Sequence, residues 1–317
     1  MTTREPTARA GKNGRDARLP LVAAPRLVPA AGYRATLRSV LVGPSVMSRT
    51  MHSPKILVLD SGVGGLTVFR EIARARPDAH FMYVLDDALF PYGKAPEGEL
   101  IDHILAVMDA FVATHQPDLA VIACNTASTL VLPCLRQRFS LPFVGTVPAI
   151  KPACAASQSK RVSVLGTEAT VAREYTHALI RSFGQGCDVT LVGSGGLAPL
   201  AEAVLAGETA SDAEICAEIA PCFVQDGGER TDTVVLACTH YPLLLDRFEA
   251  LAPWPVRWID PAPAIARRVV ELLGASNGTK NTEPAPAFFT SGRAPSIDLA
   301  AALTRFGLKF ERHTVSA

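Results

Sequence analysis

Two cysteines occupy closely similar positions in this chain of 317 residues. Cys124 follows the apolar run 119–122 and Cys238 follows the run 233–236, so each thiol stands where a buried strand is expected to end. Two like groups that face one substrate from opposite sides suit a reaction in which a proton leaves one face of a carbon and returns to the other. A single buried cysteine is more often an inert core residue, but the matched contexts favour a chemical role for both.

Small polar residues follow each thiol. The pair Asn125 and Thr126 follows the first, and the pair Thr239 and His240 follows the second. We expect a helix to start at each position, where backbone N–H groups and the helix dipole lower the pKa of a thiol from its usual value of about 8.5. The amide and hydroxyl groups are neutral donors for a carboxylate. The sequence thus predicts reactive thiols beside a site for a small polar ligand.

His240 admits two other interpretations. A Cys-x-His pair occurs in metal sites, but no further ligands are visible in the sequence, so no metal is predicted. A Cys-His pair also carries out acyl transfer, in which the imidazole activates the thiol. A hydrolase of that kind does not need a second cysteine segment, and the duplication therefore favours proton transfer.

A glycine-rich turn, Asp60-Ser-Gly-Val-Gly-Gly-Leu66, follows the apolar run 55–60. Its G-x-G-G spacing differs from the G-x-G-x-x-G pattern of dinucleotide-binding turns, so nucleotide binding is disfavoured. We interpret it as a tight strand-to-helix turn whose N–H groups contact a small ligand, with Asp60 directed into the site. The alternative is that Asp60 only caps the following helix.

A second loop, Phe90-Pro-Tyr-Gly-Lys94, follows the expected strand 80–85. Tyr92 offers a hydroxyl and Gly93 an exposed N–H group to a ligand. Such a segment is also typical of a plain turn, and both interpretations stay open at this point.

Strand-like and helix-like runs alternate from residue 55 onward. The expected strands are short, rich in Val, Ile and Leu, and lack alternation of polarity, which is typical of parallel strands covered by helices on both faces. They are 55–60, 80–85, 119–123, 143–147, 162–165, 189–192, 233–237, 256–259 and 288–290. The sequence predicts an α/β fold of two similar domains, residues 55–149 with 261–317 and residues 150–260. A ligand site is expected between them, at the carboxyl ends of the strands.

Composition and charge narrow the class of protein. Hydrophobic residues make up 48% and charged residues 19%, as in globular proteins with a sizeable core. The net charge of +1 gives no reason to expect nucleic acid as a partner, and no apolar run approaches the length of a membrane span. Seven cysteines without C-x-x-C spacing indicate free thiols in a reducing compartment, so we expect a cytoplasmic protein.

The first 54 residues differ from the rest. They carry nine Lys or Arg against two acidic residues, a net charge of +7. They superficially resemble a transit peptide, but they lack the apolar core of a secretory signal. Met47 and Met51 stand just before the first strong strand. We interpret residues 1–54 as a disordered extension or as the product of a start codon assigned too early.

Four segments resemble the signature segments of glutamate racemases, in the same order and at agreeing spacing, across residues 55–315. They are Asp60-Ser-Gly-Val-Gly-Gly-Leu66, Pro91-Tyr-Gly93, Cys124-Asn-Thr-Ala-Ser128 and Cys238-Thr-His-Tyr-Pro-Leu243. The resemblance implies a cofactor-independent enzyme with two similar α/β domains, the active site between them, and two cysteines as acid/base thiols. It places substrate contacts at Asp60, Ser61, Tyr92, Gly93, Asn125, Thr126, Thr239 and His240.

The resemblance also implies a reaction. L- and D-glutamate would be interconverted for peptidoglycan synthesis, with Cys238 abstracting the α-proton of the L-enantiomer and Cys124 donating to the other face. Asp60 and His240 would assist the thiols, while the role of Glu202 stays open because residues 193–207 align loosely. One thiolate and one thiol predict a bell-shaped pH dependence. A racemase of another acidic amino acid such as aspartate, and a non-catalytic amino-acid-binding regulator, are the alternatives. A homodimer is compatible with the sequence.

Overall fold

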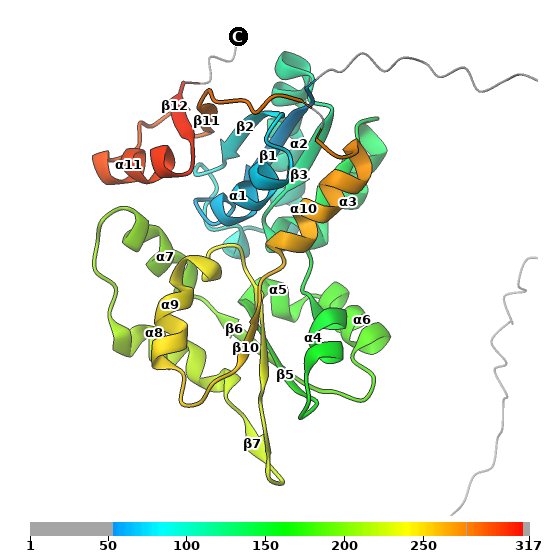
Figure 1. Cartoon of the computed structure of the whole chain (residues 1–317), viewed down its shortest axis with the longest axis vertical. Coiled ribbons are helices and arrows are strands. Elements are labelled where there is room, and N and C mark those ends of the chain that lie inside the picture. Colours follow the sequence, from blue (N-terminus) through cyan, green and yellow to red (C-terminus); the bar gives the residue numbers. More distant parts are fainter. Residues whose placement is uncertain (1–52, 277, 313–317) are drawn as a thin grey trace, which may run out of the picture. The chain divides into compact units, whose positions relative to one another are not determined.

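The computed structural model describes residues 53–276 and 278–312, which contain two parallel β-sheets flanked by helices (Figure 1). The first sheet has six strands in the order β12-β11-β2-β1-β3-β4. Their bounds are Lys55–Asp60 (β1), His80–Leu85 (β2), Leu119–Ile122 (β3), Phe143–Gly145 (β4), Ala285–Phe289 (β11) and Leu308–Glu311 (β12). Every pairing in this sheet is parallel, as the unbroken apolar runs predict.

The second sheet has four parallel strands in the order β10-β9-β5-β6. Their bounds are Arg161–Thr167 (β5), Asp188–Ser194 (β6), Thr233–Ala237 (β9) and Arg257–Ile259 (β10). A short antiparallel pair, Gln225–Asp226 (β7) with Glu229–Arg230 (β8), is separate from both sheets. β5 and β6 are longer than the sequence pattern predicts because their last residues, Gly166 to Thr167 and Gly193 to Ser194, continue the pairing.

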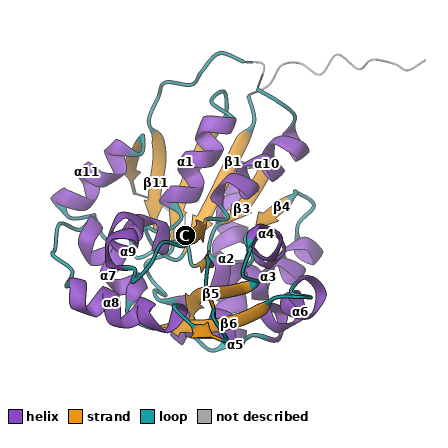
Figure 2. Cartoon of the chain, turned by 60° about the horizontal axis from the view of Figure 1, so that its bottom comes forward, coloured by secondary structure: helices purple, strands orange, loops and turns teal. Residues whose placement is uncertain are grey.

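Helices cover both faces of each sheet (Figure 2). Those beside the first sheet are Leu66–Ala75 (α1), Glu97–His115 (α2), Asn125–Arg138 (α3), Ala262–Leu273 (α10) and Ile297–Arg305 (α11), with the 3-10 turn Tyr92–Lys94 (η1). Those beside the second sheet are Ile150–Ala156 (α4), Glu168–Ala172 (α5), Glu174–Phe183 (α6), Leu197–Leu205 (α7), Asp212–Ile219 (α8) and Leu245–Leu251 (α9), with the 3-10 turns Ala220–Cys222 (η2) and Tyr241–Leu244 (η3).

The core of the first sheet follows from the alternation of side chains along a strand. Ile56 and Val58 of β1 pack into one cluster with residues of α1 and α10. Leu57 and Leu59 point to the other face and pack with residues of α2 and α3. All four side chains are fully buried, so β1 needs apolar residues at every position.

The second sheet is built in the same way. Leu165, Val234 and Leu236 pack with residues of α7, α8 and α9. Val164 and Val235 pack on the opposite face with residues of α4 and α6. Each sheet therefore forms the middle layer between two helical layers, which leaves the ends of its strands as the places where polar groups can gather.

The two sheets repeat one topology. The order β2-β1-β3-β4 of the first corresponds to β6-β5-β9-β10 of the second. In the first sheet β2 pairs with one side of β1 and β3 with the other, and in the second sheet β6 and β9 flank β5 in the same way. The chain thus reverses the direction in which strands are added, which creates a topological switch point in each sheet. The predicted α/β fold of two similar domains is confirmed.

Strand membership also supports the boundaries that we propose for the domains. All strands of the first sheet fall in 55–149 or 261–317 (the first domain), and all strands of the second fall in 150–260 (the second domain). α10 packs against α1 and so returns the chain to the first domain. The predicted extension 1–54 lies, up to residue 52, outside the described residues.

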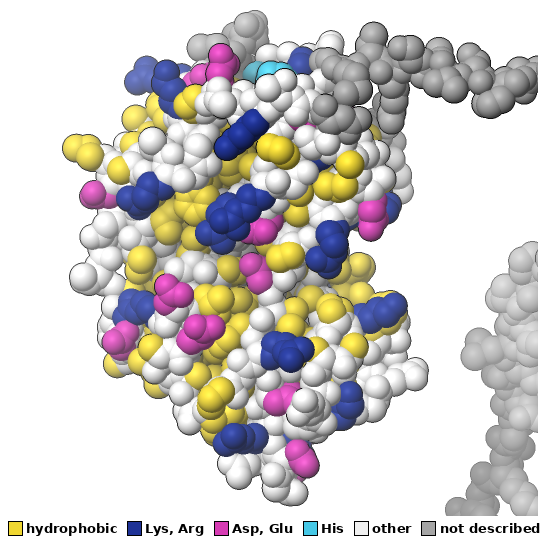
Figure 3. Space-filling view, viewed as in Figure 1, with side chains coloured by type: hydrophobic (Ala, Val, Ile, Leu, Met, Phe, Trp, Pro, Cys, Tyr) yellow, Lys and Arg dark blue, Asp and Glu magenta, His cyan; other side chains and the backbone are white. Residues whose placement is uncertain are grey.

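The surface carries both signs of charge. On the face shown in Figure 3, basic and acidic side chains are interspersed and do not gather into one patch of a single sign. None of the helices in the described ranges has the length and apolarity that crossing a membrane requires.

Candidate active site

The two cysteines lie at the two switch points. Cys124 follows β3, which is beside β1, and Cys238 follows β9, which is beside β5. Both residues are buried, with 6% of their surface exposed, and they interact electrostatically with each other. Equivalent positions in a duplicated topology thus bring two thiols from residues 114 positions apart into one site, as the matched sequence contexts predict.

The helix starts predicted after the thiols differ from each other. Cys124 is the N-cap of α3. After Cys238 the chain forms the 3-10 turn η3, and the α-helix α9 begins only at Leu245. Pro242 stands at the second position of η3. The two halves of the site therefore share a strand-end cysteine but not the structure that follows it.

Burial dominates the protonation of Cys124, contrary to the prediction of a lowered pKa. Loss of solvent and the nearby Asp60 carboxylate raise the pKa of the Cys124 thiol to about 12. The N–H group of Ala127 at the start of α3 and the Ser61 hydroxyl, whose Oγ lies 3.7 Å from the sulfur, lower that pKa only in part. The helix-start effect is present, but desolvation outweighs it.

The glycine-rich turn after β1 lies directly against the segment that contains His240. A Cβ atom on Gly64 would lie 2.5 Å from Nδ1 of His240 and 2.6 Å from its backbone nitrogen. A Cβ atom on Gly62 would lie 2.1 Å from Oε1 of Glu202. Gly64 is therefore required because a side chain there would meet the backbone of the second domain, whereas a side chain at Gly62 would displace the Glu202 carboxylate.

Asp60 agrees with both interpretations that the sequence left open, since it contacts the start of α1 and also reaches the site between the domains. Its Oδ2 accepts hydrogen bonds from the N–H groups of Gly62 (3.2 Å) and Gly65 (3.0 Å), the latter being the N-cap of α1. Its Oδ1 accepts a hydrogen bond from the Thr239 hydroxyl of the second domain at 3.3 Å. Burial raises the pKa of Asp60, although His240 and the two N–H groups act against that shift. One carboxylate thus holds the turn and also reaches the opposite domain.

Cys238, His240 and Glu202 form a continuous polar chain. The sulfur of Cys238 lies 3.7 Å from Nδ1 of His240, and Nε2 of the same ring lies 2.7 Å from Oε1 of Glu202. Burial acts to lower the pKa of His240, but its contacts with Cys238 and Glu202 outweigh burial and raise that pKa well above the usual value. The geometry favours an imidazolium next to Cys238.

Glu202, whose role the sequence left open, is a further candidate site residue in the structure. It lies on α7, and its Oε1 also accepts a hydrogen bond from the N–H group of Val63 at 2.7 Å. The motif around it carries no distinctive spacing. Only the approach of α7 to the glycine-rich turn of the other domain gives it a partner.

Asn125 and Thr126 begin α3 and are both buried. Oδ1 of Asn125 accepts a hydrogen bond from the Thr146 hydroxyl at 3.5 Å, and its Nδ2 is buried without a hydrogen-bond partner in the part of the chain that the structure describes. The Thr126 hydroxyl lies 3.0 Å from that of Thr167 and 3.1 Å from that of Thr170, both in the second domain. A buried amide N–H₂ group without a partner is costly, so Nδ2 of Asn125 is a candidate donor for a substrate carboxylate.

Tyr92 and Gly93 lie in η1. The Tyr92 hydroxyl donates a hydrogen bond to the buried carboxylate of Asp86, so it is engaged inside the first domain. Gly93 faces Thr167 and Ala169 of the second domain, with 3.8 Å from its Cβ position to Cβ of Ala169. Of this pair, Gly93 faces the interdomain boundary.

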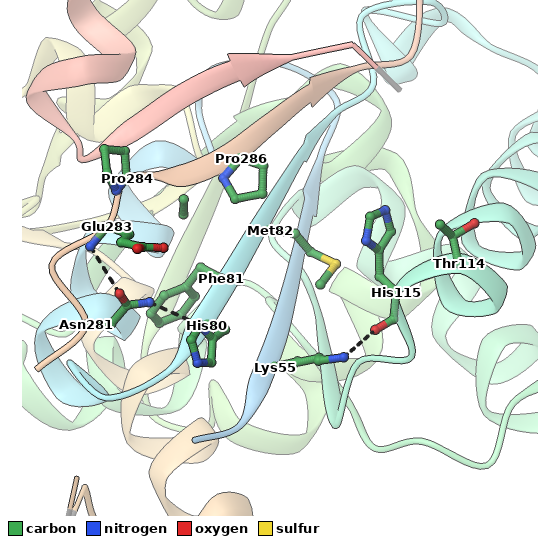
Figure 4. A pocket seen from close by; sticks show the side chains of 11 residues that line it. Lys55, His80, Phe81, Met82, Thr114, His115, Asn281, Glu283, Pro284 and Pro286 are labelled. Carbon is green, nitrogen blue, oxygen red and sulfur yellow. Dashed lines mark hydrogen bonds between the residues drawn. The ribbon is translucent and has the colours of Figure 1, made fainter. Parts of the chain in front are cut away.

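Outside this site, the described residues include a further pocket but no cluster suited to a metal ion. Among the described residues, no group of three or more His, Cys, Asp or Glu side chains is arranged to hold a metal ion. A pocket of about 350 Å³ lies at the amino ends of the strands of the first sheet, where Lys55 and His80 begin β1 and β2 (Figure 4). None of the predicted site residues lines it.

These features define a two-domain α/β isomerase with its polar groups at paired switch points. The chain belongs to the Asp/Glu/Hydantoin racemase family, whose model matches residues 56–269. The glutamate racemase of Brucella ovis is 53% identical over 258 residues, covering 80% of this chain and 93% of that protein. The glutamate racemase of Sinorhizobium medicae is 52% identical over 266 residues, covering 83% and 97%.

Solved structures agree with this assignment. Escherichia coli glutamate racemase, in complex with L-glutamate and the activator UDP-MurNAc-Ala, superposes with a TM-score of 0.76 at 39% identity and covers 84% of this chain and 100% of that one. The isoform RacE1 of Bacillus anthracis gives 0.70 at 25% identity, covering 84% and 98%. The resemblance to glutamate racemases and the prediction of an amino-acid racemase are confirmed.

Proposed function

We propose that this enzyme interconverts L- and D-glutamate by proton transfer between the substrate Cα and the thiols of Cys124 and Cys238. The observation that carries the proposal is the position of both buried thiols at the matching switch points of two domains. The names of its curated relatives and the L-glutamate in the E. coli complex support the choice of substrate.

The two thiols have different starting protonation states in this mechanism. The His240 imidazolium stabilises a thiolate at Cys238, and the raised pKa of about 12 keeps Cys124 protonated. The Cys238 thiolate takes the α-proton of L-glutamate, and the electron pair of the C–H bond stays on the substrate. The Cys124 thiol then gives its proton to the opposite face and becomes a thiolate. The reverse reaction starts from that state.

The remaining groups bind the substrate and stabilise the negative charge that develops on it during proton transfer. We assign the α-carboxylate to neutral donors, among them Nδ2 of Asn125 and the Thr126 hydroxyl, while Thr239 contacts the substrate beside Asp60, the acceptor of its hydroxyl hydrogen. The N–H group of Gly93 is a further donor at the domain boundary, and Ser61 and Tyr92 complete the predicted set. Neutral donors in a buried site stabilise negative charge that develops on the carboxylate side of Cα.

Circular dichroism tests the reaction and the substrate together. Purified enzyme without added cofactor should abolish the ellipticity of pure L-glutamate and of pure D-glutamate, and both samples should converge on zero ellipticity. In deuterated water, NMR should show loss of the α-proton signal. Aspartate enantiomers provide the comparison, and faster racemisation of aspartate, or no exchange with any acidic amino acid, would overturn the proposal.

We further propose that the product supplies peptidoglycan synthesis in the cytoplasm. All seven cysteines are free thiols, which supports a reducing compartment. A strain that lacks the gene should require D-glutamate for growth, and unimpaired growth without it would contradict this role. The homodimer stays a prediction, which light scattering of the purified protein would test.

A further inference from the structure

Arg173 of the second domain contacts two segments of the first domain. It lies between α5 and α6, and only 11% of its side chain is exposed. Its Nη1 donates hydrogen bonds to the backbone carbonyl of Thr126 and to the Thr129 hydroxyl, the latter at 2.9 Å. Its Nε lies 3.3 Å from Oε1 of Glu97, at the start of α2. A guanidinium with several fixed partners on one side holds a defined orientation.

These contacts bring a positive charge to the helix turn that begins beside Cys124. Thr126 is the second residue of α3, whose N-cap is Cys124. Burial lowers the pKa of Arg173, while Glu97 and the Cys124 thiol raise it. The hydrogen bonds of Arg173 to Thr126 and Thr129 hold the guanidinium against the first turn of α3, which begins at Cys124.

Among the described residues, the side chains and N–H group that most affect the Cys124 thiol are neutral or negative. Asp60 and Cys238 disfavour its thiolate, while Ser61 and the N–H group of Ala127 favour it through hydrogen bonds. The Tyr83 and Tyr92 hydroxyls also interact with the sulfur. The His240 imidazole contacts the other thiol. Reaction from D-glutamate requires a thiolate at Cys124, and these neighbours offer no cation to stabilise it.

We propose that Arg173 is a positioning residue that stabilises the thiolate of Cys124 from the opposite domain, as His240 does for Cys238. The inference deepens the proposed function and rests on it for the role of that thiolate. Because Arg173 and Cys124 belong to different domains, the charge reaches the thiol only while the domains are in contact. Domain closure and activation of the thiol are thereby linked.

Competitive alkylation of the two thiols tests the proposal without substrate. The full-length protein is treated with iodoacetamide at pH 8, and mass spectrometry gives the ratio of modified Cys124 to modified Cys238. Both thiols lie at the same domain boundary, so the ratio cancels changes in domain opening. Arg173→Gln should lower the ratio about tenfold, which corresponds to a rise of about one unit in the pKa of Cys124. Arg173→Lys keeps the positive charge, so its alkylation ratio should lie close to that of the wild type.

Two further variants separate the charge from the mechanical contact. Glu97→Gln removes the ion pair but leaves the guanidinium, so it should not lower the ratio. Arg181→Gln removes an exposed arginine that pairs with Glu174 on α6 and should leave the ratio unchanged. If Arg173 only fastened the domains, Arg173→Gln would leave the ratio unchanged or raise it, and either result overturns the proposal.

Kinetics gives a second measurement. L- and D-glutamate have equal free energies, so Arg173→Gln must lower kcat/KM by the same factor in both directions. The acid limb of the kcat profile with D-glutamate should move to higher pH, and an unmoved limb would count against a thiolate-stabilising role. The alkylation ratio needs no turnover, so a protein that fails to racemise glutamate would refute the proposed function and still test Arg173.

Discussion

Nε2 of His240 lies 2.7 Å from Oε1 of Glu202, and the same carboxylate oxygen accepts a hydrogen bond from the N–H group of Val63 in the other domain. One oxygen therefore orients the imidazole beside Cys238 and also joins α7 to the glycine-rich turn. Because Glu202 favours the charged imidazole, the contact affects both the protonation of His240 and the closure of the domains.

Replacement of Glu202 by Gln should reduce racemisation. The amide keeps the size of the side chain but removes the negative charge that helps to raise the pKa of His240. We expect kcat to fall about 10- to 100-fold, with a smaller change in KM. Steady-state kinetics with both enantiomers measures this. Glu208→Gln, at an exposed position near α7, should retain full activity; equal activity of the two variants would exclude a role for Glu202.

Removal of either thiol should leave one-sided proton exchange. Cys124→Ala retains the base for L-glutamate, and Cys238→Ala retains the base for D-glutamate. Each variant should lose racemisation by at least about 100-fold, yet each should still exchange the α-proton of its own enantiomer in deuterated water. Chiral chromatography with NMR detects both effects. Cys216→Ala alters an exposed thiol and should behave as the wild type. Near-normal racemisation by both single variants would refute the two-thiol mechanism.

Replacement of Asn125 by Ala should weaken substrate binding more than turnover. Within the described residues Nδ2 of Asn125 is buried without a hydrogen-bond partner, so its loss deprives a bound carboxylate of a donor. The substitution also removes the acceptor of the buried Thr146 hydroxyl. We expect KM for glutamate to rise about tenfold, with some loss of stability because the buried Thr146 hydroxyl loses its acceptor. Asn125→Asp places a negative charge there and should bind substrate still more weakly. A KM that is unchanged in both variants would remove Asn125 from the substrate site.

Replacement of Gly64 by Ala should prevent the domains from meeting. The added Cβ would lie within 2.6 Å of both His240 and the Thr239 hydroxyl, closer than real contacts allow. We expect kcat/KM to fall at least about tenfold because the groups of the two domains no longer align. Gly98→Ala is the matched control, since that Cβ meets nothing within 4 Å and the residue lies in α2. Its activity should be unchanged, and its stability should rise by up to about 1 kcal/mol.

Asp232 should make folding stability fall in acid. Burial acts to raise its pKa, but hydrogen bonds from the Ser157 hydroxyl and the N–H groups of Gln158 and Ser159 outweigh burial and lower the pKa from 3.8 to about 2. The folded protein then binds fewer protons than the unfolded chain in this range, so the stabilisation is complete above about pH 4 and is lost as the pH falls through 2.

Denaturant titration at several pH values measures that contribution. Asp232→Asn should be less stable than the wild type at pH 6, and the difference in free energy of unfolding should shrink as the pH approaches 2. Asp102→Asn changes an exposed carboxylate on α2 and should show no such dependence. A difference that stays constant with pH would show that the ionised form of Asp232 does not stabilise the fold.

Sequence alone determined the features that depend on neighbours along the chain. Unbroken apolar runs mark strands buried on both faces, so the α/β class, the central strands and the strand-end positions of both cysteines follow directly. The start of β11 does not follow from the sequence pattern, which predicts a strand from residue 288. The strand begins at Ala285, because Ala285 and Pro286 pair with β12 although they lie outside the pairing with β2. A proline there is not typical of a strand interior, which hid the start of the strand.

Tertiary structure decided what joins the two domains and how burial affects the Cys124 thiol. Glu202 and Val63 are 139 positions apart, and Arg173 and Thr126 are 47 apart, so no local pattern relates them. The prediction of a lowered thiol pKa considered only the helix start, whereas burial, which depends on all surrounding elements, raises the pKa of Cys124. The sequence therefore located the two thiols, and packing of the two domains gave them different partners, Ser61 beside Cys124 and His240 beside Cys238.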